Sequence, residues 1–481
     1  MNINREDVIV SALSSLLLEN IVECEDFNNV EKFGVEKTSE LLCRAFKCAL
    51  EAMDEVIFQE KDLRFKSKGF EVRSVLTSAG LITYKRRRYK SESEAVYLLD
   101  EALGLPHHLK VSPQLSCLAA TFALDASYQA AADALSYYIG TTLSRSSVKR
   151  LLKQNACLLE GGNTQESKVS SPSLNIEADG CYVYQQRTKA QKRADKLGGK
   201  KRSRRASKEV AIFCAYSGKK NVGKNVKVRT HATHFATTKA APDAWSEFSS
   251  LLSKRYDTDN VTHTNFATDG DAKYLKGAKT LPGKVSVGYD LHHIPSKIAH
   301  TLGADIAREV FATMKELGFE DGFDILETYC EHFYELEKDE KYLDLIEFFN
   351  THKQSMKTAL VHNLGTMEGS IAHIIGSRCK RFGGGWGTGL DPMVRLRAAR
   401  ASGIRPVLAT RKSTTLLPEI VQSRTLLEVE NFIADLEQRA KENYTAYDRK
   451  KLGDKPLYYH QVQVPHKSSN ERCASLLRKW G

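Results

Sequence analysis

Alternating apolar and polar residues mark five candidate strands in the middle of the chain. A helical spacing of apolar residues at Asp243–Tyr256 separates the third strand from the fourth, and short helical patterns follow the fourth and fifth. Three strands, a helix and then alternating strands and helices predict a mixed α/β sheet. The strands are expected at Leu174–Tyr184, Glu209–Tyr216, Val226–Thr233, Val261–Thr268 and Val285–Tyr289.

Helical patterns dominate on both sides of this sheet. The region 66–110 is the exception, because Val72–Tyr89 is typical of a hairpin that turns at Ala79-Gly80 and ends in the basic run Lys85–Arg88. That run could contact a nucleic-acid backbone or belong to a solvated hairpin. Amphipathic helices are expected at Val8–Leu18, Glu36–Glu60, Ile306–Leu317, Asp324–Leu336, Lys341–Asn350 and Leu416–Tyr444.

Ser127–Lys153 has the spacing of a helix-turn-helix, with a turn at Gly140 and a second helix capped near Ser144. In that motif the second helix reads DNA in the major groove. An ordinary helical hairpin has the same pattern, but the position just ahead of the mixed sheet favours DNA binding. The residues expected on the exposed side of the second helix are Arg145, Ser147, Lys149, Arg150 and Lys153.

Positive charge is unevenly placed along the chain. The 481 residues carry a formal net charge of +12, and Arg187–Lys208 holds eleven basic residues against one acid, Asp195. Such a run predicts a loop that becomes ordered on a phosphate backbone without sequence preference, although a solvated loop or a nuclear address has the same composition. Its candidate DNA contacts are Lys200, Lys201, Arg202, Arg204 and Arg205.

Several classes of protein are disfavoured by the sequence. The ten cysteines form no Cys-x-x-Cys pair, so we expect reduced thiols rather than a zinc finger or a disulfide framework. No apolar run reaches the ~18 residues needed to cross a membrane. Glu6 and Asp7 precede the first apolar run, which argues against a secretory signal. A length of 481 residues predicts two to four modules.

Three acidic residues stand where a fold could bring distant carboxylates together: Asp179 in the first strand, Asp269 at the end of the fourth, and Glu368 at the start of a helical run. Carboxylate oxygens suit Mg²⁺, and two such ions about 3.5–4 Å apart support in-line displacement at a phosphodiester. Asp271 competes with Asp269, which we favour because it ends the strand. The pattern predicts phosphodiester hydrolysis or transfer.

Further polar residues surround this trio in the sequence. Asp290 and His293 follow the last strand, and His293 could orient a ligand or a phosphate, or be a satisfied structural histidine. Rival carboxylates occur at i, i+4 spacing in the helical region, where a solvated acidic face is the simpler explanation. They are Glu327, Glu331 and Glu335.

Four stretches carry a family resemblance. The chain resembles DDE transposases of the ISLre group of bacterial insertion sequences, first catalogued as an uncharacterised protein family and distantly similar to Mutator-like transposases. The family usually has Ala directly after its Asp-Gly and a Trp at the position of Tyr274, whereas Asp271 is interposed here. The matching stretches are Val75–Tyr89; Ile176–Gly180 with Gln185; Asp269–Lys276 with Asp290-x-x-His293; and Glu368–His373 with Trp386 and Met393–Arg397.

The resemblance implies a DNA transposase that binds the ends of its element and cuts and rejoins strands. Asp179, Asp269 and Glu368 would hold two Mg²⁺ or Mn²⁺ ions, with Asp271, Asp290, His293 and Trp386 around them. It also implies a homo-oligomer on double-stranded DNA in the cytoplasm, associated with the nucleoid. The alternatives are a non-catalytic DNA-binding protein derived from a transposase and a structure-selective RNase H-like nuclease.

The expected architecture is an α/β RNase H-like core with an all-helical insertion, behind a mostly helical N-terminal region. The expected divisions are 1–65, N-terminal helices; 66–110, β-hairpin and linker; 111–165, helix-turn-helix; 172–302, first part of the core; 303–366, helical insertion; 367–411, final catalytic helix and Trp/Arg-rich segment; and 412–481, C-terminal helix and basic tail.

Overall fold

The computed structural model of the protein describes residue 10 and residues 13–18, 26–61, 63, 65–91, 94–106, 108–161, 168–198, 206–223, 226–380 and 385–404. These residues divide into two compact units. One contains the described residues up to Thr38 together with Ala52–Asp62, and the other contains Ser39–Glu51 and the described residues from Leu63 onward. The predicted C-terminal helix at 416–444 and the tail lie outside the described residues.

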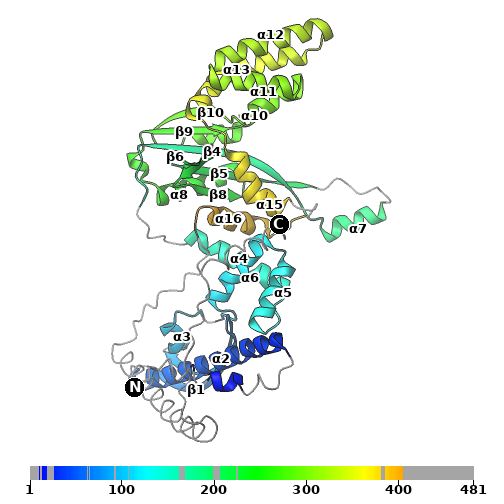
Figure 1. Cartoon of the computed structure of the whole chain (residues 1–481). Coiled ribbons are helices and arrows are strands. Elements are labelled where there is room, and N and C mark those ends of the chain that lie inside the picture. Colours follow the sequence, from blue (N-terminus) through cyan, green and yellow to red (C-terminus); the bar gives the residue numbers. More distant parts are fainter. Residues whose placement is uncertain are drawn as a thin grey trace, which may run out of the picture. The chain divides into compact units, whose positions relative to one another are not determined.

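A five-stranded sheet lies at the centre of the second unit (Figure 1), in the order β10-β9-β4-β5-β8. The central strand β4 runs antiparallel to β5 and parallel to β9. The strands are β4 (Ser173–Tyr184), β5 (Ser207–Tyr216), β8 (Thr233–Thr237), β9 (His263–Thr268) and β10 (Lys284–Tyr289), with helices α8 (Ala241–Arg255) and α9 (Ala272–Ala278) between the later strands.

The third strand of this sheet differs from the prediction. Val226–Thr233 was expected there, but β7 (Val226–Thr230) pairs instead with β6 (Gly218–Gly223) in a separate two-stranded sheet. His231 has a positive φ of 51°, so the chain turns before Thr233. The third strand is therefore β8, whose five residues are all buried and show no alternation that a sequence pattern could reveal.

The two faces of β4 have different neighbours because successive side chains of a strand point to opposite sides. Leu174, Ile176 and Ala178 join the core beneath α8. Cys181 and Val183 join a second core formed with the helical run α14 (Met367–Ser370), η2 (Ile371–Gly376) and α15 (Ser377–Cys379) and with α16 (Leu390–Ala401). Asp179 has the parity of Cys181 and faces this second core.

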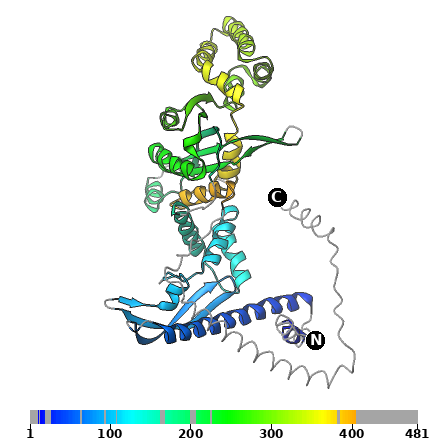
Figure 2. The same ribbon diagram turned by 90° about the vertical axis from the view of Figure 1, so that its left-hand side faces the viewer.

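A helical bundle follows β10, as the apolar spacing predicted. It contains α10 (His293–Leu302), α11 (Ala304–Glu316), α12 (Phe319–Glu337) and α13 (Lys341–His362), which share one apolar core. Figure 2 shows these yellow-green helices grouped together outside the sheet. Helix α13 continues well past the predicted end at Asn350 and packs on β10, which brings the chain back to the sheet before α14.

An N-terminal antiparallel sheet contains the predicted hairpin. Strands β1 (Lys66–Thr77) and β2 (Gly80–Ser91) pair along their length, and β3 (Glu94–Val96) adds a short third strand. Arg86 is buried and paired with Asp100 of α3 (Leu98–Ala102), as is Arg73 at 2.5 Å. Neither expectation for the basic run, a backbone contact or a solvated hairpin, therefore fits Arg86.

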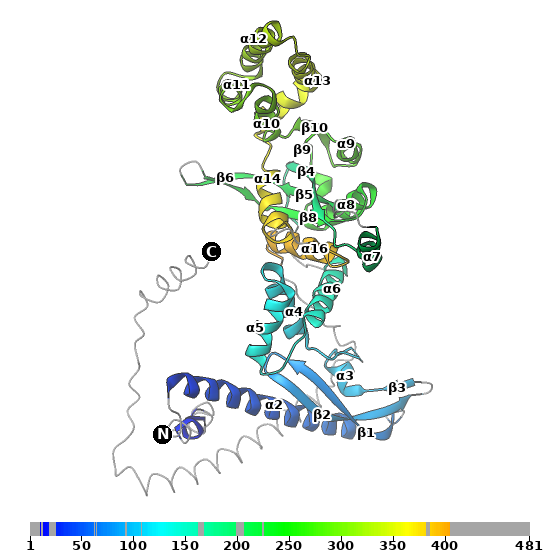
Figure 3. The ribbon, with the colours of Figure 1, turned by 90° about the vertical axis from the view of Figure 1, so that its right-hand side faces the viewer.

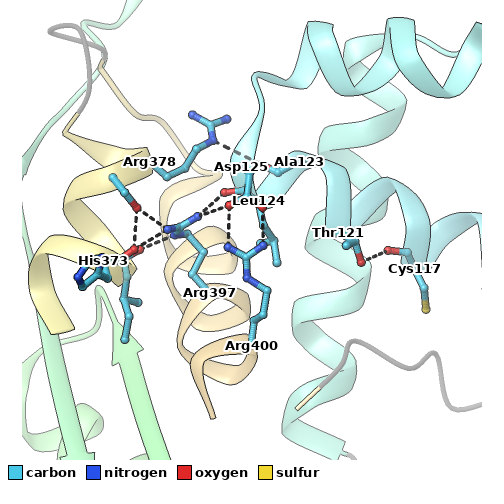
Figure 4. A network of polar contacts seen from close by, with 11 residues as sticks. Cys117, Thr121, Ala123, Leu124, Asp125, His373, Arg378, Arg397 and Arg400 are labelled. Carbon is cyan, nitrogen blue, oxygen red and sulfur yellow. Dashed lines mark hydrogen bonds and ion pairs between the residues drawn. The ribbon is translucent and has the colours of Figure 1, made fainter. Parts of the chain in front are cut away.

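Three helices, α4 (Pro113–Asp125), α5 (Tyr128–Ile139) and α6 (Arg145–Gly161), connect this sheet to the central one, with a left-handed Gly140 between α5 and α6. Helix α4 is held to α16 by a network around Arg397 (Figure 4). Arg397 donates to the carbonyls of Leu124 and His373 at 2.5 and 2.6 Å, and to the carbonyl of Ile374. This arginine anchor joins α4, η2 and α16.

The basic run after β4 is a helix in part, which corrects the prediction of a loop ordered on binding. Helix α7 (Lys189–Leu197) begins with a capping box, in which Thr188 accepts a hydrogen bond from the Gln191 N–H and the Gln191 side chain accepts one from the Thr188 N–H. The stabilisation of α7 by this capping box exceeds the electrostatic repulsion among its basic side chains. Residues 199–205 lie outside the described residues.

Candidate active site

Asp179 lies near the middle of β4, buried and facing the α14 side of the sheet. Its Oδ1 accepts a hydrogen bond from the backbone N–H of Gly180 at 2.6 Å. Gly180 is needed here, because a Cβ at this position would lie 2.3 Å from Oε1 of Glu209 and 2.9 Å from the Tyr274 hydroxyl. Glycine at this position therefore leaves room for the side chains of Glu209 and Tyr274 next to Asp179.

Strand register brings two more aspartates to this level of the sheet. Glu177 pairs with Ala267 on β9, so continuing the parallel register places Asp269 beside Asp179. Tyr289 pairs with Thr268, and the Asp290 N–H donates to the carbonyl of Thr268 at 3.0 Å, so Asp290 follows on β10. Asp179 within β4 thus lies at the level where the neighbouring parallel strands β9 and β10 end in Asp269 and Asp290.

Asp271 is engaged elsewhere. It caps α9, accepting the Lys273 N–H at 3.0 Å, and its Oδ2 lies 2.7 Å from Lys273 Nζ. The hydrogen bonds to Lys273 hold the pKa of Asp271 below its usual range. Asp269 accepts from the Asp271 N–H and directly follows β9. Asp271 is thus engaged with Lys273, whereas Asp269 ends the strand, and the choice of Asp269 as the ligand stays a prediction.

A possible metal-binding group forms around Asp179. One ligand atom each from Asp179, Asp290 and His293 lies within 4.8 Å of the others. His293 Nε2 stands 3.9 Å from Asp179 Oδ2, is buried, and has no hydrogen-bond partner among the described residues. The carboxylate oxygens suit Mg²⁺ or Mn²⁺, and the imidazole nitrogen of His293 is a further donor beside Asp179.

Electrostatics at this group reflect crowding of negative charge. Burial raises the pKa of Asp290, and the nearby carboxylates of Glu177 and Asp179 raise it further. The interaction with Asp179 raises the pKa of His293 against the opposing effect of burial. A cation placed here would relieve the repulsion among the carboxylates.

Glu177 fixes the start of the helix that carries Glu368. Its carboxylate accepts the N–H of Thr366 at 2.6 Å and the Thr366 hydroxyl at 2.8 Å, and it also accepts the Tyr216 hydroxyl. Gly365 allows this approach, because its φ is +122° and a Cβ would stand 2.7 Å from Asp290 Oδ1. Residues 365–366 are thereby held against both Asp290 and β4.

Glu368 is the second residue of α14, two residues after Thr366, and its side chain is exposed. Burial raises the pKa of the Cys181 thiol to about 11, and the negative charges of Asp179 and Glu368 contribute to this increase. Cys181 shares the face of β4 with Asp179. Glu368 is thus on the helix that covers the face where Asp179 points.

Trp386 lies away from these carboxylates. It forms a β-bridge with Gln185, six residues beyond Asp179 along β4, or about 20 Å at the usual strand rise. Its indole N–H donates to the carbonyl of Cys379 at 3.0 Å, and its ring packs in the core beside Arg378. The structure assigns it a packing role instead of the expected place around the metal ligands.

The basic residues of α6 divide into two sets. Arg145 and Arg150 are exposed. Lys153 donates to the Thr388 hydroxyl at 3.1 Å, and Lys149 packs against Gly389, so both face the segment before α16 rather than open solvent. Ser147 contacts Ser144 at the helix start. The predicted exposed side is therefore only partly exposed.

Two other sets of candidates have different outcomes. Lys200, Lys201, Arg202, Arg204 and Arg205 lie outside the described residues. Glu331 and Glu335 are exposed on α12 and Glu327 is half-buried, in a bundle whose core is separate from that of α14. The solvated acidic face favoured from the sequence fits these glutamates.

Sequence reasoning missed the role of Glu177. Its signal was present, since a charged residue two positions before Asp179 shares the strand face with it. It also missed the cations of β6 and β7, because their strand pairing was not predicted. No helix within the described ranges has the length and apolar character that a membrane span requires.

Residues 17–411 match the model of one family, described as an uncharacterised protein family (UPF0236). A curated relative from Streptococcus gallolyticus, named "UPF0236 protein in vanSb 3'region", is 22% identical over 386 residues, which cover 76% of this chain and 81% of that protein. Because the family match covers most of the sequence, the chain belongs to UPF0236.

Proposed function

We propose that this member of UPF0236 is a DNA transposase with a DDE active site, which cuts and joins phosphodiester bonds. The observation that carries the proposal is the acidic row formed by Asp179 within β4 and by Asp269 and Asp290 directly after β9 and β10, with the start of the Glu368 helix held by Glu177. We take Asp179, Asp269 and Glu368, which come from separate segments of the chain, as the three acids that the resemblance names.

The proposed fold of the core is RNase H-like. Its support is the topology: three antiparallel strands in chain order, a helix, and two strands parallel to the first on its other side. The helical bundle between β10 and α14 corresponds to the insertion expected ahead of the last catalytic helix. In such a fold, residues far apart in sequence come together beside the carboxyl ends of the strands.

The residues would share the work as follows. Asp179, Asp269 and Glu368 hold two Mg²⁺ or Mn²⁺ ions, and Asp290 and His293 supply further donors beside Asp179. When bound, such ions stabilise charge that develops on phosphate oxygens during in-line displacement. Glu177 and Gly365 position the Glu368 helix, and exposed cations such as Arg145 and Arg150 bind the DNA backbone.

The test uses the purified full-length chain and a supercoiled plasmid carrying the DNA that flanks its gene. With Mg²⁺ or Mn²⁺ we expect strand cleavage that leaves 3′-hydroxyl ends, followed by joining of those ends to a second plasmid. Chelation with EDTA should stop both reactions. Cleavage without joining would indicate a nuclease, and metal-independent binding of the flanking DNA without any cleavage would indicate a DNA-binding protein.

A further inference from the structure

The β6–β7 hairpin is attached to the segment that carries Glu368. Lys219 on β6 donates to the carbonyl of Asn363 at 2.5 Å, and Arg229 on β7 donates to the Ser370 hydroxyl at 2.8 Å. Figure 3 shows β6 leaving the sheet beside α14. The base of the hairpin is thus fixed next to the proposed catalytic helix, two residues from Glu368.

A cavity of about 750 Å³ lies between this hairpin, α14 and η2. The residues around it include Lys219, Lys227, Arg229, His234 and His373, and no carboxylate is among its lining residues. A neighbouring cavity of about 310 Å³ shares Lys219 and Lys227 and adds neutral amides such as Asn221. The two hollows together present one cationic surface with polar neighbours.

The cations of this surface come from one face of the hairpin. Lys219 pairs across the strands with Arg229, and Asn221 with Lys227, so these four side chains project to the same side. Lys220 pairs with Val228 and projects to the opposite side. The register therefore sorts the lysines of this hairpin into two sets that can be tested separately.

Positive charge in the cavity is not neutralised by neighbouring acids. Within the part of the chain that the structure describes, no ion pair involves Lys219, Lys227 or Arg229, whereas buried Arg395 pairs with Asp391 and Glu247. Burial lowers the pKa of Lys219, and Arg229 and Lys227 lower it further against the attraction of Glu177. Clustered cations of this kind stabilise a bound anion.

His234 provides an independent sign of a ligand. Its side chain is only 7% exposed, it lines the cavity, and its Nδ1 has no hydrogen-bond partner among the described residues. Burial and the nearby Arg229 lower its pKa to about 4, so the ring is neutral near pH 7. Buried polar atoms are rarely left without a partner, and a ligand oxygen would satisfy this one.

We infer that the cavity binds backbone phosphates of the DNA strand engaged by the active site, with Lys219, Lys227 and Arg229 as the charged contacts. The inference rests on the proposed function, because it takes DNA as the substrate. Two adjoining hollows that share two lysines suit consecutive phosphates of one strand better than a single small anion. The Arg229–Ser370 bond sets the distance between this contact and Glu368.

The test measures binding of a labelled 30-base-pair duplex by fluorescence anisotropy at several salt concentrations, without divalent metal. The variants are Lys227→Gln, whose side chain is exposed, and the double variant Lys219→Gln/Lys227→Gln. The matched control is Lys220→Gln on the opposite face. Each lost phosphate contact should reduce the log–log salt slope by about 0.9, so the double variant should lose about 1.8 and the control nothing.

Two further arms identify the ligand. Duplexes with single neutral methylphosphonates should show one or two positions that weaken binding to the wild-type chain but not to the double variant. Inorganic phosphate and ATP should compete only weakly. Tight binding of either one that DNA does not displace would overturn the assignment to DNA.

The outcomes separate this inference from the proposed function. Equal salt slopes for the double variant and Lys220→Gln would refute the phosphate site alone. A wild-type chain that binds duplex DNA but never cleaves the plasmid would refute the transposase proposal and leave the binding result standing.

Discussion

Two polar regions of the molecule differ in how completely their groups are bonded. In the arginine anchor on α16, Arg397 is buried and all three guanidinium nitrogens donate to oxygens of α4 and the η2–α15 run. At the acidic row, Asp290 is equally buried, but its carboxylate accepts only the His292 N–H among the described contacts, and His293 Nε2 makes no hydrogen bond shorter than its 3.9 Å approach to Asp179.

The difference indicates which region serves stability and which serves chemistry. A saturated network stabilises the fold, since every buried group has replaced its water contacts. Crowded, buried carboxylates such as Asp290 oppose folding, and such local conflicts are expected at functional sites. The comparison therefore predicts that variants in the two regions will separate stability from activity.

The largest effect is expected on stability from Arg397→Met. Removing the guanidinium leaves three backbone carbonyls without their buried donor, which should lower the free energy of unfolding by about 3–5 kcal/mol. Urea unfolding followed by circular dichroism measures it. Arg400→Gln is the control, because Arg400 is more exposed and bonds only Asp125 of this network, so a loss of at most about 1 kcal/mol is expected. Equal losses of unfolding free energy in the two variants would contradict the proposed role of Arg397 as an anchor.

The next effect is expected on activity, from Asp179→Asn. Plasmid cleavage should fall by a factor on the order of 10²–10³, as when one charge-stabilising group is removed from an active site. Unfolding free energy should stay unchanged or rise, because repulsion with Asp290 is relieved. Asp271→Asn is the matched control and should retain cleavage within a few-fold, since Asn also caps helices. A stable Asp179→Asn chain that cleaves normally would sink the assignment.

Gly365→Ala is expected to lower both stability and activity, unlike the two variants above. A Cβ 2.7 Å from Asp290 Oδ1, at a φ of +122°, should cost about 1–3 kcal/mol of stability and shift the start of the Glu368 helix. Cleavage should therefore fall together with stability. Gly369→Ala, which has open space around its Cβ, should change neither by comparison. Unimpaired cleavage in Gly365→Ala would show that cleavage does not require the close approach of residue 365 to Asp290.

The smallest effect is expected from Trp386→Phe. The lost indole hydrogen bond to Cys379 should cost roughly 1 kcal/mol of stability, and plasmid cleavage by the folded chain should match wild type. A large loss of cleavage at unchanged stability would restore Trp386 to the surroundings of the metal ligands, where the resemblance had placed it.

The strands that hold the acidic row could be predicted because their patterns are local. β4, β5, β9 and β10 each alternate or form short apolar runs bounded by turn residues. The third strand could not, since the positive φ of His231 depends on contacts made by the folded chain. Because the pairing of β6 with β7 was not predicted, the cationic face of this hairpin was also missed. Only the pairing register shows which of its side chains share a face.

The candidate site was predictable in part for the same reason. Asp179 and Asp269 were recognisable from their places in strands, and Asp290-x-x-His293 from its place after the last one. The proximity of His293 to Asp179 was not visible, because it depends on β9 separating their strands by one position. The role of Glu177, which lies within the matching stretch Ile176–Gly180, was not visible either, because its bond to Thr366 spans 189 residues of sequence.

The π-helical turn η2 restricts how this protein can change by insertion or deletion. A π turn corresponds to one extra residue in an α-helix, and each residue turns the helix by about 100°. Arg397 grips the carbonyls of His373 and Ile374 within that turn. Gain or loss of one residue between Glu368 and His373 would rotate Glu368 around the helix, while the hydrogen bonds from Arg397 would hold the π turn in place. Homologues should therefore keep this interval constant in length, even where its side chains differ.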